Sequence, residues 1–500
     1  MRRKKLAKNT ISSLFFQITT IVCGFILPRL ILGYYGSEVN GLVQSVAQFL
    51  SLISFLELGV GAVVQSSLYK PLADKDNDKI SSIWASANRF FRTIAIILLL
   101  YVVLLIVIYP SLVNKNFDFV FTATLILVMS ISSFAQYYFG IVNRLLLTAD
   151  QRGYIQYNSQ TATLILNTIV CVVLIRIGAS IQILKLVTSL IYLIRPLYLY
   201  FYVKKHYKIN SRIKYTDDPI KQKWSGIAQH VAYIILDGTD NVVLTLFSTL
   251  ANVSIYSVYY LVVSGIKSLI IVCTSGVQSL MGELWAKQEL DSLKRLFGMV
   301  EWGIHTAVSL VFGCTMFLIV PFVQVYTNGI TDVDYVVPTF AILITLANAL
   351  HCLRLPYNLM ILAGGHYKQT QSNYIIAAVL NIVISILMVR WLGLVGVAIG
   401  TIIAMTYQTV WMAIYDSKNF IKWPIKNFIK QLGIDVLEIL ISWIIVRNFH
   451  MNDVSVLSWL ILSIKTFLVS CIVIGLVNYL LYKGNMRKLF GLVVRKVIKS

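Results

Sequence analysis

Long apolar runs separated by short polar segments form the dominant pattern along the chain. A helix needs about 20 consecutive apolar residues to cross the hydrocarbon core of a bilayer. Runs of this length recur throughout the sequence and predict an all-α polytopic membrane protein of about fourteen transmembrane helices. The predicted spans are 10–33, 40–66, 91–110, 119–147, 157–177, 181–203, 226–247, 253–282, 299–325, 334–363, 369–390, 394–415, 431–448 and 457–482. The first run is too long for the apolar region of a signal peptide, so we expect it to remain as the first helix.

The basic residues of the polar segments predict the orientation. They gather in alternate connections, which are the N-terminal segment and residues 70–89, 204–223, 418–430 and 483–499. The opposite connections are short and carry a single basic residue, Lys115. Because cytoplasmic loops hold the excess of Lys and Arg, we expect both termini to be cytoplasmic in a multi-pass protein of the cell (cytoplasmic) membrane.

The composition excludes a soluble protein. Of the 500 residues, 58% are hydrophobic and 13% are charged, whereas a soluble globular chain carries roughly 25% charged residues. The net charge of +22 is spread over short loops, which indicates contact with anionic lipid headgroups rather than with nucleic acid. The six cysteines lie in apolar runs without a CxxC pair, so we interpret them as packing residues and predict no metal site.

The two halves of the chain show a phased similarity. Residues 166–176 (LNTIVCVVLIR) match residues 380–390 (LNIVISILMVR), and Asn143 corresponds to Asn358. These matches predict two six-helix lobes of the same orientation, related by an axis along the membrane normal. The predicted domains are an N-terminal lobe (1–203), a cytoplasmic linker (204–225), a C-terminal lobe (226–415), and two additional helices with a basic cytoplasmic tail (416–500).

Five segments make the chain resemble a known superfamily. They are residues 8–10 (KNT), 26–33 (ILPRLILG), 35–42 (YGSEVNGL), 55–61 (FLELGVG) and 146–152 (LLTADQR). With the predicted two-lobe architecture, they are similar to the multidrug/oligosaccharidyl-lipid/polysaccharide flippase superfamily. Within it, the chain most resembles the bacterial polysaccharide repeat-unit flippases.

The resemblance implies a function. A repeat-unit flippase moves an undecaprenyl-diphosphate-linked oligosaccharide from the inner to the outer leaflet by alternating access, for a capsule, O-antigen or teichoic-type surface polysaccharide. Its partners would be this glycan, membrane lipids and polysaccharide polymerase machinery, and we expect a monomer that binds no nucleic acid. The same superfamily leaves open a peptidoglycan-precursor flippase and a multidrug or organic-cation antiporter.

A membrane polysaccharide polymerase or glycosyltransferase is disfavoured. Such proteins need a sizeable outward loop, and the predicted outer loops are short. The sequence also lacks HExxH, GxSxG and Walker A patterns, so we predict neither an enzyme nor a cofactor. Coupling to a Na⁺ or H⁺ gradient is left open.

Cations inside the predicted spans are the first candidates for a substrate site. A charge near mid-bilayer costs roughly 2.5–3.5 kcal/mol on insertion scales, so such residues indicate function. Arg29, Lys267 and Arg354 are of this kind. Cations of these types bind the phosphate oxygens of a diphosphate. Tyr256 and Tyr260 are candidates for stacking on sugar rings.

Intramembrane acids and histidines have two interpretations. Glu57, Asp237 and Asp240 either pair with cations across helices or bind a coupling Na⁺ or H⁺. His305 and His351 either pack and donate hydrogen bonds within the bundle or relay protons.

Overall fold

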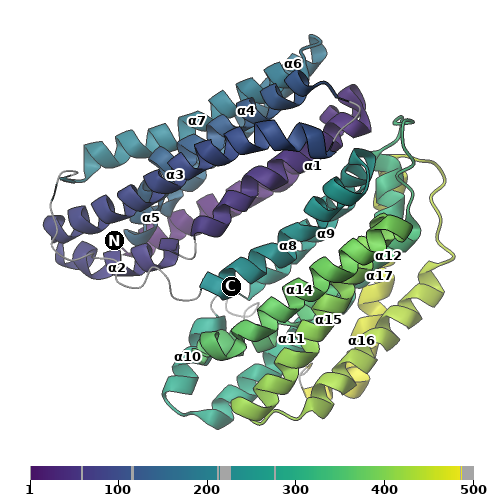
Figure 1. Ribbon diagram of the computed structural model, residues 1–500. Helices are drawn as coiled ribbons and strands as arrows, with labels where there is room; N and C mark the ends of the chain where they lie inside the picture. Colours follow the sequence, from purple (N-terminus) through teal and green to yellow (C-terminus); the bar gives the residue numbers. More distant parts are fainter. Residues whose placement is uncertain are drawn as a thin grey trace. The chain divides into compact units, whose positions relative to one another are not determined.

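The computed structural model describes residues 2–57, 60–113, 117–210, 213, 227–274, 277–484 and 486. Its regular structure over these residues is helical throughout, without a strand (Figure 1). The helices of residues 1–254 are α1 (Arg2–Ser51), η1 (Leu52–Glu57), α2 (Val60–Asp74), α3 (Asn77–Val113), α4 (Phe119–Ala135), η2 (Gln136–Gly140), α5 (Ile141–Ala149), α6 (Gly153–Arg176), α7 (Ile181–His206) and α8 (Ile227–Phe247). Those that follow are α9 (Leu250–Cys273), α10 (Val277–Ala286), α11 (Leu290–Tyr326), α12 (Pro338–Leu353), α13 (Leu355–Ala363), α14 (Tyr367–Leu392), α15 (Leu394–Asn419), α16 (Ile425–Val446) and α17 (Val456–Leu481).

Each of the fourteen predicted spans corresponds to one helix or to consecutive helices. By length and apolar composition, 11 helices of the described residues qualify as membrane spans. One of these, Lys8–Glu57, contains the first predicted span and the start of the second. The helix is interrupted at Gly36, whose φ of 84° and ψ of 173° lie outside the helical region. Glycine adopts this conformation because it has no Cβ.

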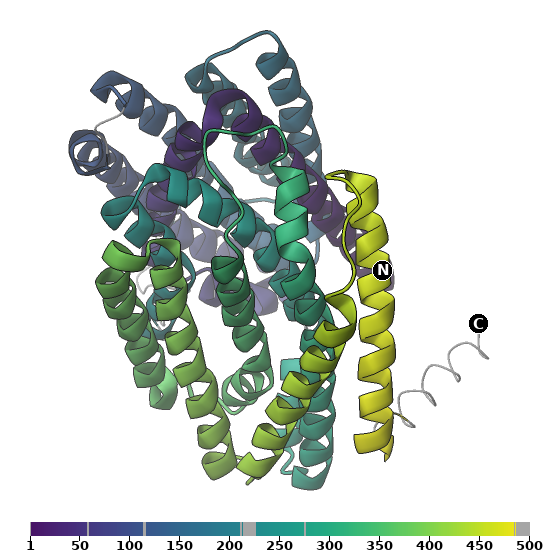
Figure 2. The same cartoon turned by 90° about the vertical axis from the view of Figure 1, so that its right-hand side faces the viewer.

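The two remaining predicted spans are α8 and α16. In α16, Lys426, Lys430, Asp435 and Glu438 lie within 22 residues, so every 18-residue stretch of this helix carries more than two charges. These charges are the reason that α16 is not among the qualifying spans. In Figure 2, α17 (yellow) runs beside α16, against which it packs.

The fourth and the tenth predicted spans are interrupted along their length. The fourth contains a π-helical turn, Gln136–Gly140, between α4 and α5. The tenth breaks at Arg354, between α12 and α13. Pro356 lacks the N–H that would bond to the carbonyl of Cys352, which accounts for the second break. The short helices that result, α5 and α13, have 9 residues each.

The contacts divide the chain into two compact units, Met1–Ser254 and Ile255–Ser500. In the first unit α2 packs on α5 and α4 on α7, and in the second α10 packs on α13 and α12 on α15. This recurrence is the pattern that an internal repeat requires. The helix α8, which the sequence assigns to the C-terminal lobe, packs on α1 and α3. The lobe boundaries at 203 and 226 stay a prediction, and most of the predicted linker 204–225 lies outside the described residues.

Two of the segments that carry the superfamily resemblance contact each other. The side chain of Asn9 donates to the carbonyl of Gln151 (3.0 Å) and accepts from the backbone N–H of Tyr154 (2.8 Å). The start of α1 is therefore tied to the loop between α5 and α6.

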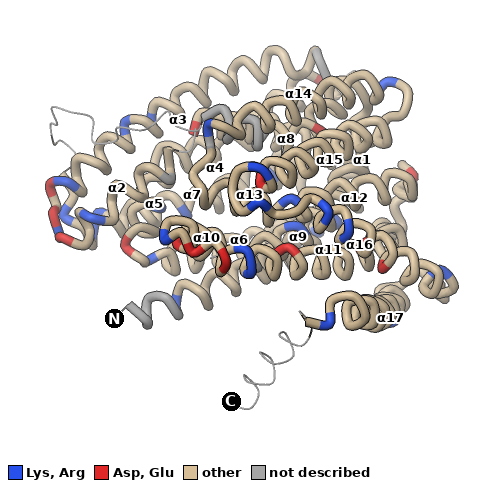
Figure 3. Tube along the Cα trace, turned by 90° about the horizontal axis from the view of Figure 1, so that it is seen from below, with Lys and Arg blue, Asp and Glu red and all other residues tan. Residues whose placement is uncertain are grey.

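Figure 3 shows long tan stretches along the helices, with most of the blue Lys and Arg segments near helix ends.

Glycines allow a close approach between α14 and α15. A Cβ on Gly396 would lie 2.5 Å from the carbonyl oxygen of Met388, and one on Gly400 would lie 2.3 Å from Ser385 Oγ. With Ala404, these residues form a small-residue stripe at four-residue spacing. Such stripes let the backbones of membrane helices pack closely.

Candidate functional site

Arg354 occupies the break between α12 and α13. Its side chain is 2% exposed, and it is among the largest fully buried side chains. Nη2 lies 3.2 Å from His351 Nδ1, while Nε and Nη1 have no hydrogen-bond partner in the described part of the chain. Burying a guanidinium without filling its donors is costly. Arg354 therefore holds unused capacity for an anionic ligand.

Lys267 lies in the last third of α9 and is 7% exposed. Its Nζ is 5.5 Å from the ring centroid of Tyr260, a cation–π geometry. Tyr260 in turn stacks on Tyr256, with 5.5 Å between the ring centroids and 16° between the planes. Tyr256 is buried and Tyr260 is half-buried.

The structure brings these predicted residues together. Lys267 and Arg354 both lie within electrostatic range of the His351 imidazole and the Cys352 thiol. The Arg354 guanidinium also lies 6.0 Å from the centroid of the Tyr374 ring. We call Lys267, Arg354, His351, Tyr256 and Tyr260 the cationic cluster. The planar guanidinium of Arg354 and the compact ammonium of Lys267 can bind phosphate oxygens, and the neighbouring aromatic rings can stack on sugars.

The predicted site residues of the first unit are spread over α1, η1 and α8. Arg29 is half-buried, and its Nη1 lies 3.1 Å from the position of a Cβ on Gly33, so this glycine leaves room for the guanidinium. Asp240 is buried in α8. The side chain of Asp237 lies outside the described residues.

Glu57 lines a cavity of about 440 Å³ within the first unit. Its Oε1 accepts a hydrogen bond of 2.7 Å from the Tyr137 hydroxyl. Arg144 and Lys185 line the same cavity, and both are cations that the sequence analysis did not single out. Both residues lie inside predicted membrane spans, and this position could have marked them as candidate site residues. Arg144 directly follows Asn143, one of the residues that mark the repeat.

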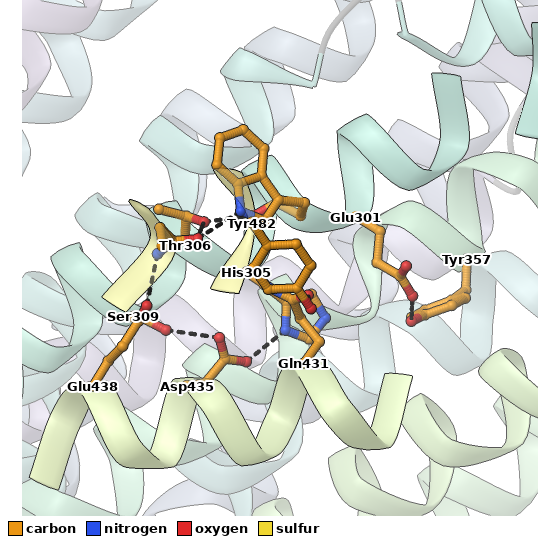
Figure 4. Close-up of polar contacts among 11 residues, drawn as sticks. Glu301, His305, Thr306, Ser309, Tyr357, Gln431, Asp435, Glu438 and Tyr482 are labelled. Atoms are coloured by element: carbon orange, nitrogen blue, oxygen red, sulfur yellow. Dashed lines mark hydrogen bonds and ion pairs between the residues drawn. The ribbon is translucent and has the colours of Figure 1, made fainter. Parts of the chain in front are cut away.

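The second unit contains a buried polar network between α11, α16 and α17 (Figure 4). His305 is fully buried, and its Nδ1 lies 2.5 Å from Asp435 Oδ2. The Ser309 hydroxyl donates to the other oxygen of Asp435 (2.9 Å). His305 therefore pairs with an acid on a neighbouring helix.

The network continues to α17 through Asn478. Trp302 Nε1 donates to Asn478 Oδ1 (2.6 Å), and Asn478 Nδ2 donates to Glu438 Oε1 (2.7 Å). A further acid, Glu301, accepts hydrogen bonds from the Tyr357 hydroxyl and from Trp423 Nε1 (2.8 Å). We call Glu301, His305, Asp435 and Glu438 the acidic network.

Sequence reasoning missed the α16 members of this network, although the sequence carried a signal. Gln431, Asp435, Glu438 and Ser442 are all buried, and they follow one another at spacings of four, three and four residues. This spacing places them on one face of a helix. A polar stripe within an otherwise apolar span indicates a buried interhelical network. Among the described residues, no cluster of His, Cys, Asp and Glu is arranged to hold a metal ion.

No family model matches the sequence, and no curated protein matches it. Solved structures do match its fold. The Lipid II flippase MurJ in an inward closed conformation has a TM-score of 0.71 and 15% identity, covering 96% of this chain and 99% of that one. A multidrug resistance MATE family transporter in an inward-facing conformation has a TM-score of 0.57 and 15% identity, covering 80% and 94%. The Vibrio cholerae MATE transporter VcmN has a TM-score of 0.58 and 12% identity, covering 84% and 98%. Both kinds of neighbour are in the MOP superfamily of multidrug/oligosaccharidyl-lipid/polysaccharide flippases, and this chain has the fold of that superfamily.

Proposed function

We propose that this protein is a flippase that moves a lipid-linked oligosaccharide, carried on undecaprenyl diphosphate, across the cytoplasmic membrane. The observation that carries the proposal is the buried Arg354 guanidinium, whose Nε and Nη1 lack partners in the described structure. Lys267 adds a second cation in the same region. A diphosphate between lipid and sugar supplies acceptors for the unfilled donors of Arg354.

The energetics favour such a cargo. A buried charge without a counterion costs several kcal/mol, so it persists where a ligand compensates it during function. Bidentate hydrogen bonds from arginine to phosphate oxygens are among the strong hydrogen bonds in proteins. The stacked pair Tyr256 and Tyr260 offers an aromatic surface next to Lys267 for the first sugars of the oligosaccharide.

The orientation follows the distribution of basic residues. Both termini are cytoplasmic in this proposal, because the basic connections share one side of the predicted topology. The substrate then enters from the inner leaflet and leaves in the outer one. Each cycle alternates the access of the cationic cluster between the two sides.

A second candidate cargo is the lipid-linked peptidoglycan precursor. The MurJ structure, named for a Lipid II flippase, matches over 96% of this chain with a higher TM-score than the two MATE structures. Such a cargo has the same diphosphate chemistry and needs the same cations. An organic-cation antiporter is disfavoured, because Lys267 and Arg354 would repel its substrates.

The test is the accumulation of lipid intermediates in cells that lack this protein. Undecaprenyl-linked oligosaccharides are extracted and measured after complementation with the wild-type chain, Arg354→Lys or Lys267→Ala. Lys465→Ala is the matched control, because it removes a cation from an exposed position on α17.

We expect the wild type and Lys465→Ala to clear the intermediates, and the two cluster variants at equal membrane abundance to leave them. Accumulation of the peptidoglycan precursor instead supports the second cargo. Normal levels of both lipids, together with altered sensitivity to organic cations, contradict the proposed cargo.

A further inference from the structure

The acidic network holds more acids than basic groups. Glu301, His305, Asp435 and Glu438 are each at most 6% exposed. Asp416 on α15 is fully buried next to them, within electrostatic range of Glu301, and neither of its carboxylate oxygens has a hydrogen-bond partner among the described residues. The imidazole of His305 is the one basic group inside this set of four carboxyl groups.

The helices packed around the network contribute mainly phenols and apolar side chains, and Arg354, at the break between α12 and α13, bonds to His351 instead. Tyr357 on α13 and Tyr482 after α17 contribute phenols, and α12 faces α11 with apolar residues such as Cys352 and Leu353. On α10, Glu283 and Lys287 form an exposed ion pair with each other, 2.5 Å apart.

Three cations line an adjoining cavity. This cavity of about 430 Å³ lies between residues of α11, α16 and the segment after α17, and its cations are Lys294, Arg295 and Lys430. Lys430 lies 5.0 Å from the ring centroid of Tyr482. None of the three forms an ion pair with the acids of the network in the described structure.

The carboxyl groups of this set outnumber its imidazole. Each unpaired carboxylate in a low-dielectric interior costs several kcal/mol, and a bound proton removes that cost. Proton binding is therefore a direct way to balance this set of charges.

Unfilled hydrogen-bonding positions mark where a proton is held. His305 Nε2 and Glu438 Oε2 are buried and have no hydrogen-bond partner among the described residues. The same holds for the hydroxyls of Ser442 and Thr466, which extend the polar lining along α16 and α17. These atoms form a polar path in an otherwise apolar bundle.

The cavity gives this path an opening. Its lining includes Glu301, Trp302, Gln431 and Tyr482. Gln431 accepts from the Tyr482 hydroxyl (2.6 Å), and Trp302 leads through Asn478 to Glu438. The cavity thus borders Glu301 directly and connects to Glu438 through the hydrogen-bonded side chains of Trp302 and Asn478.

We propose that the acidic network is a proton-binding site that couples a proton gradient to the flippase cycle, with Glu301 at its opening and His305, Asp435 and Glu438 holding the proton. The proton comes from water in the cavity and returns to water, so no other reactant is required. The coupling rests on the proposed function, whereas the binding of the proton does not.

Infrared difference spectroscopy of the full-length protein in lipid tests the binding step without a transport assay. Protonated carboxyl groups give a C=O band separate from that of carboxylates. We expect the intensity of this band to change with pH, and the band to be diminished in Asp435→Asn and Glu438→Gln.

Glu57→Gln is the matched control, since Glu57 is also an intramembrane acid that accepts from a tyrosine. We expect it to leave the component lost in the α16 variants intact. His305→Gln serves as a second probe and should shift the pH at which the band titrates. Gel filtration and thermal unfolding establish that each variant is folded.

A spectrum that does not titrate, or one that the α16 variants and His305→Gln leave unchanged, overturns the proposal. A spectrum that responds to Na⁺ at constant pH and not to pH also overturns it. A titrating band combined with normal lipid-linked intermediates in cells without the protein retains the proton site and rejects the proposed cargo. The two ideas therefore fail separately.

Discussion

Arg354 Nη2 lies 3.2 Å from His351 Nδ1, and both side chains are buried. A guanidinium is always protonated and has no acceptor, so the imidazole nitrogen accepts this hydrogen bond. This contact fixes the position of the Arg354 guanidinium relative to His351. This geometry separates it from His305, whose Nδ1 faces the Asp435 carboxylate.

Replacing Arg354 by methionine should separate stability from transport. Removing a buried charge in favour of an apolar side chain of similar length is often neutral or stabilising by about 1–4 kcal/mol. We expect Arg354→Met to unfold no earlier than the wild type while clearance of lipid-linked oligosaccharide is lost. Thermal unfolding in detergent and lipid extraction from the same cells measure the two effects. A large loss of stability would assign Arg354 a structural role.

The glycines of α15 give a packing prediction. Gly400→Ala places a methyl group 2.9 Å from the backbone nitrogen of Ser385, which cannot move aside freely. We expect a loss of about 1–3 kcal/mol, as for overpacking in a core. Gly265→Ala in α9 is the matched control, because nothing lies within 4 Å of its Cβ position. That control should be neutral or stabilising by up to about 1 kcal/mol. Equal effects of both changes would contradict the close packing of α14 on α15.

A phenol beyond the end of α7 gives a pH prediction. The Tyr207 hydroxyl donates to Asp150 Oδ2 (2.6 Å), and Arg152 Nε lies 2.8 Å from the same oxygen. Burial, and then the Asp150 carboxylate, raise the pKa of Tyr207 above its ordinary value of about 10. A raised folded-state pKa means that this contribution to stability is complete below about pH 10 and is lost as the pH rises through the folded-state pKa.

Tyr207→Phe should therefore destabilise the protein by about 0.5–1.5 kcal/mol at neutral pH. The difference in stability between Tyr207→Phe and the wild type should shrink at strongly alkaline pH. There the wild-type phenol is ionised and no longer donates the hydrogen bond. Unfolding midpoints of both proteins over a series of pH values check this. A difference that grows with pH would show that the hydrogen bond does not stabilise the loop.

Two tyrosine–glutamate pairs allow a comparison within one chain. Tyr357 donates to Glu301, and Tyr137 donates to Glu57. Removing either hydroxyl deprives an acid of a donor, which costs about 1–3 kcal/mol when the acid is buried. Because Glu301 is buried and Glu57 is half-buried, we expect Tyr357→Phe to cost more than Tyr137→Phe.

A double-mutant cycle isolates the Tyr357 contribution. In the Glu301→Gln background, the added cost of Tyr357→Phe should fall, because the neutral amide needs less compensation. The measurement is again the unfolding midpoint of the purified protein. An unchanged cost in that background would place the effect of Tyr357 in its packing rather than in its hydrogen bond.

The sequence predicts most of this fold because bilayer thickness sets a length that apolar runs reveal directly. All fourteen predicted spans have helical counterparts, including α16, where polar residues lower the hydropathy. Breaks within spans were harder to place. The break at Arg354 has a proline two residues later, but the π-helical turn Gln136–Gly140 has no comparable marker in its sequence.

Sequence analysis could predict those members of the candidate site that are charged, because burying a single charge within a membrane span is costly. Lys267 and Arg354 were selected because they are charged at mid-span, and the structure places both near His351. Their roles remain a prediction. The pairing of His305 with Asp435 was not predictable, since it joins helices separated by more than a hundred residues. A single sequence shows which residues share one face of a helix, but it does not show which helices pack against each other.

The most direct test of the central claim is flipping in reconstituted vesicles. Purified undecaprenyl-diphosphate oligosaccharide is placed in proteoliposomes, and its exposure in the outer leaflet is followed with a membrane-impermeant glycan-modifying enzyme. We predict that the wild type and Lys465→Ala exchange the lipid between leaflets, and that Arg354→Met and Lys267→Ala do not. Equal exchange by all four proteins, or none by the wild type, would contradict the account.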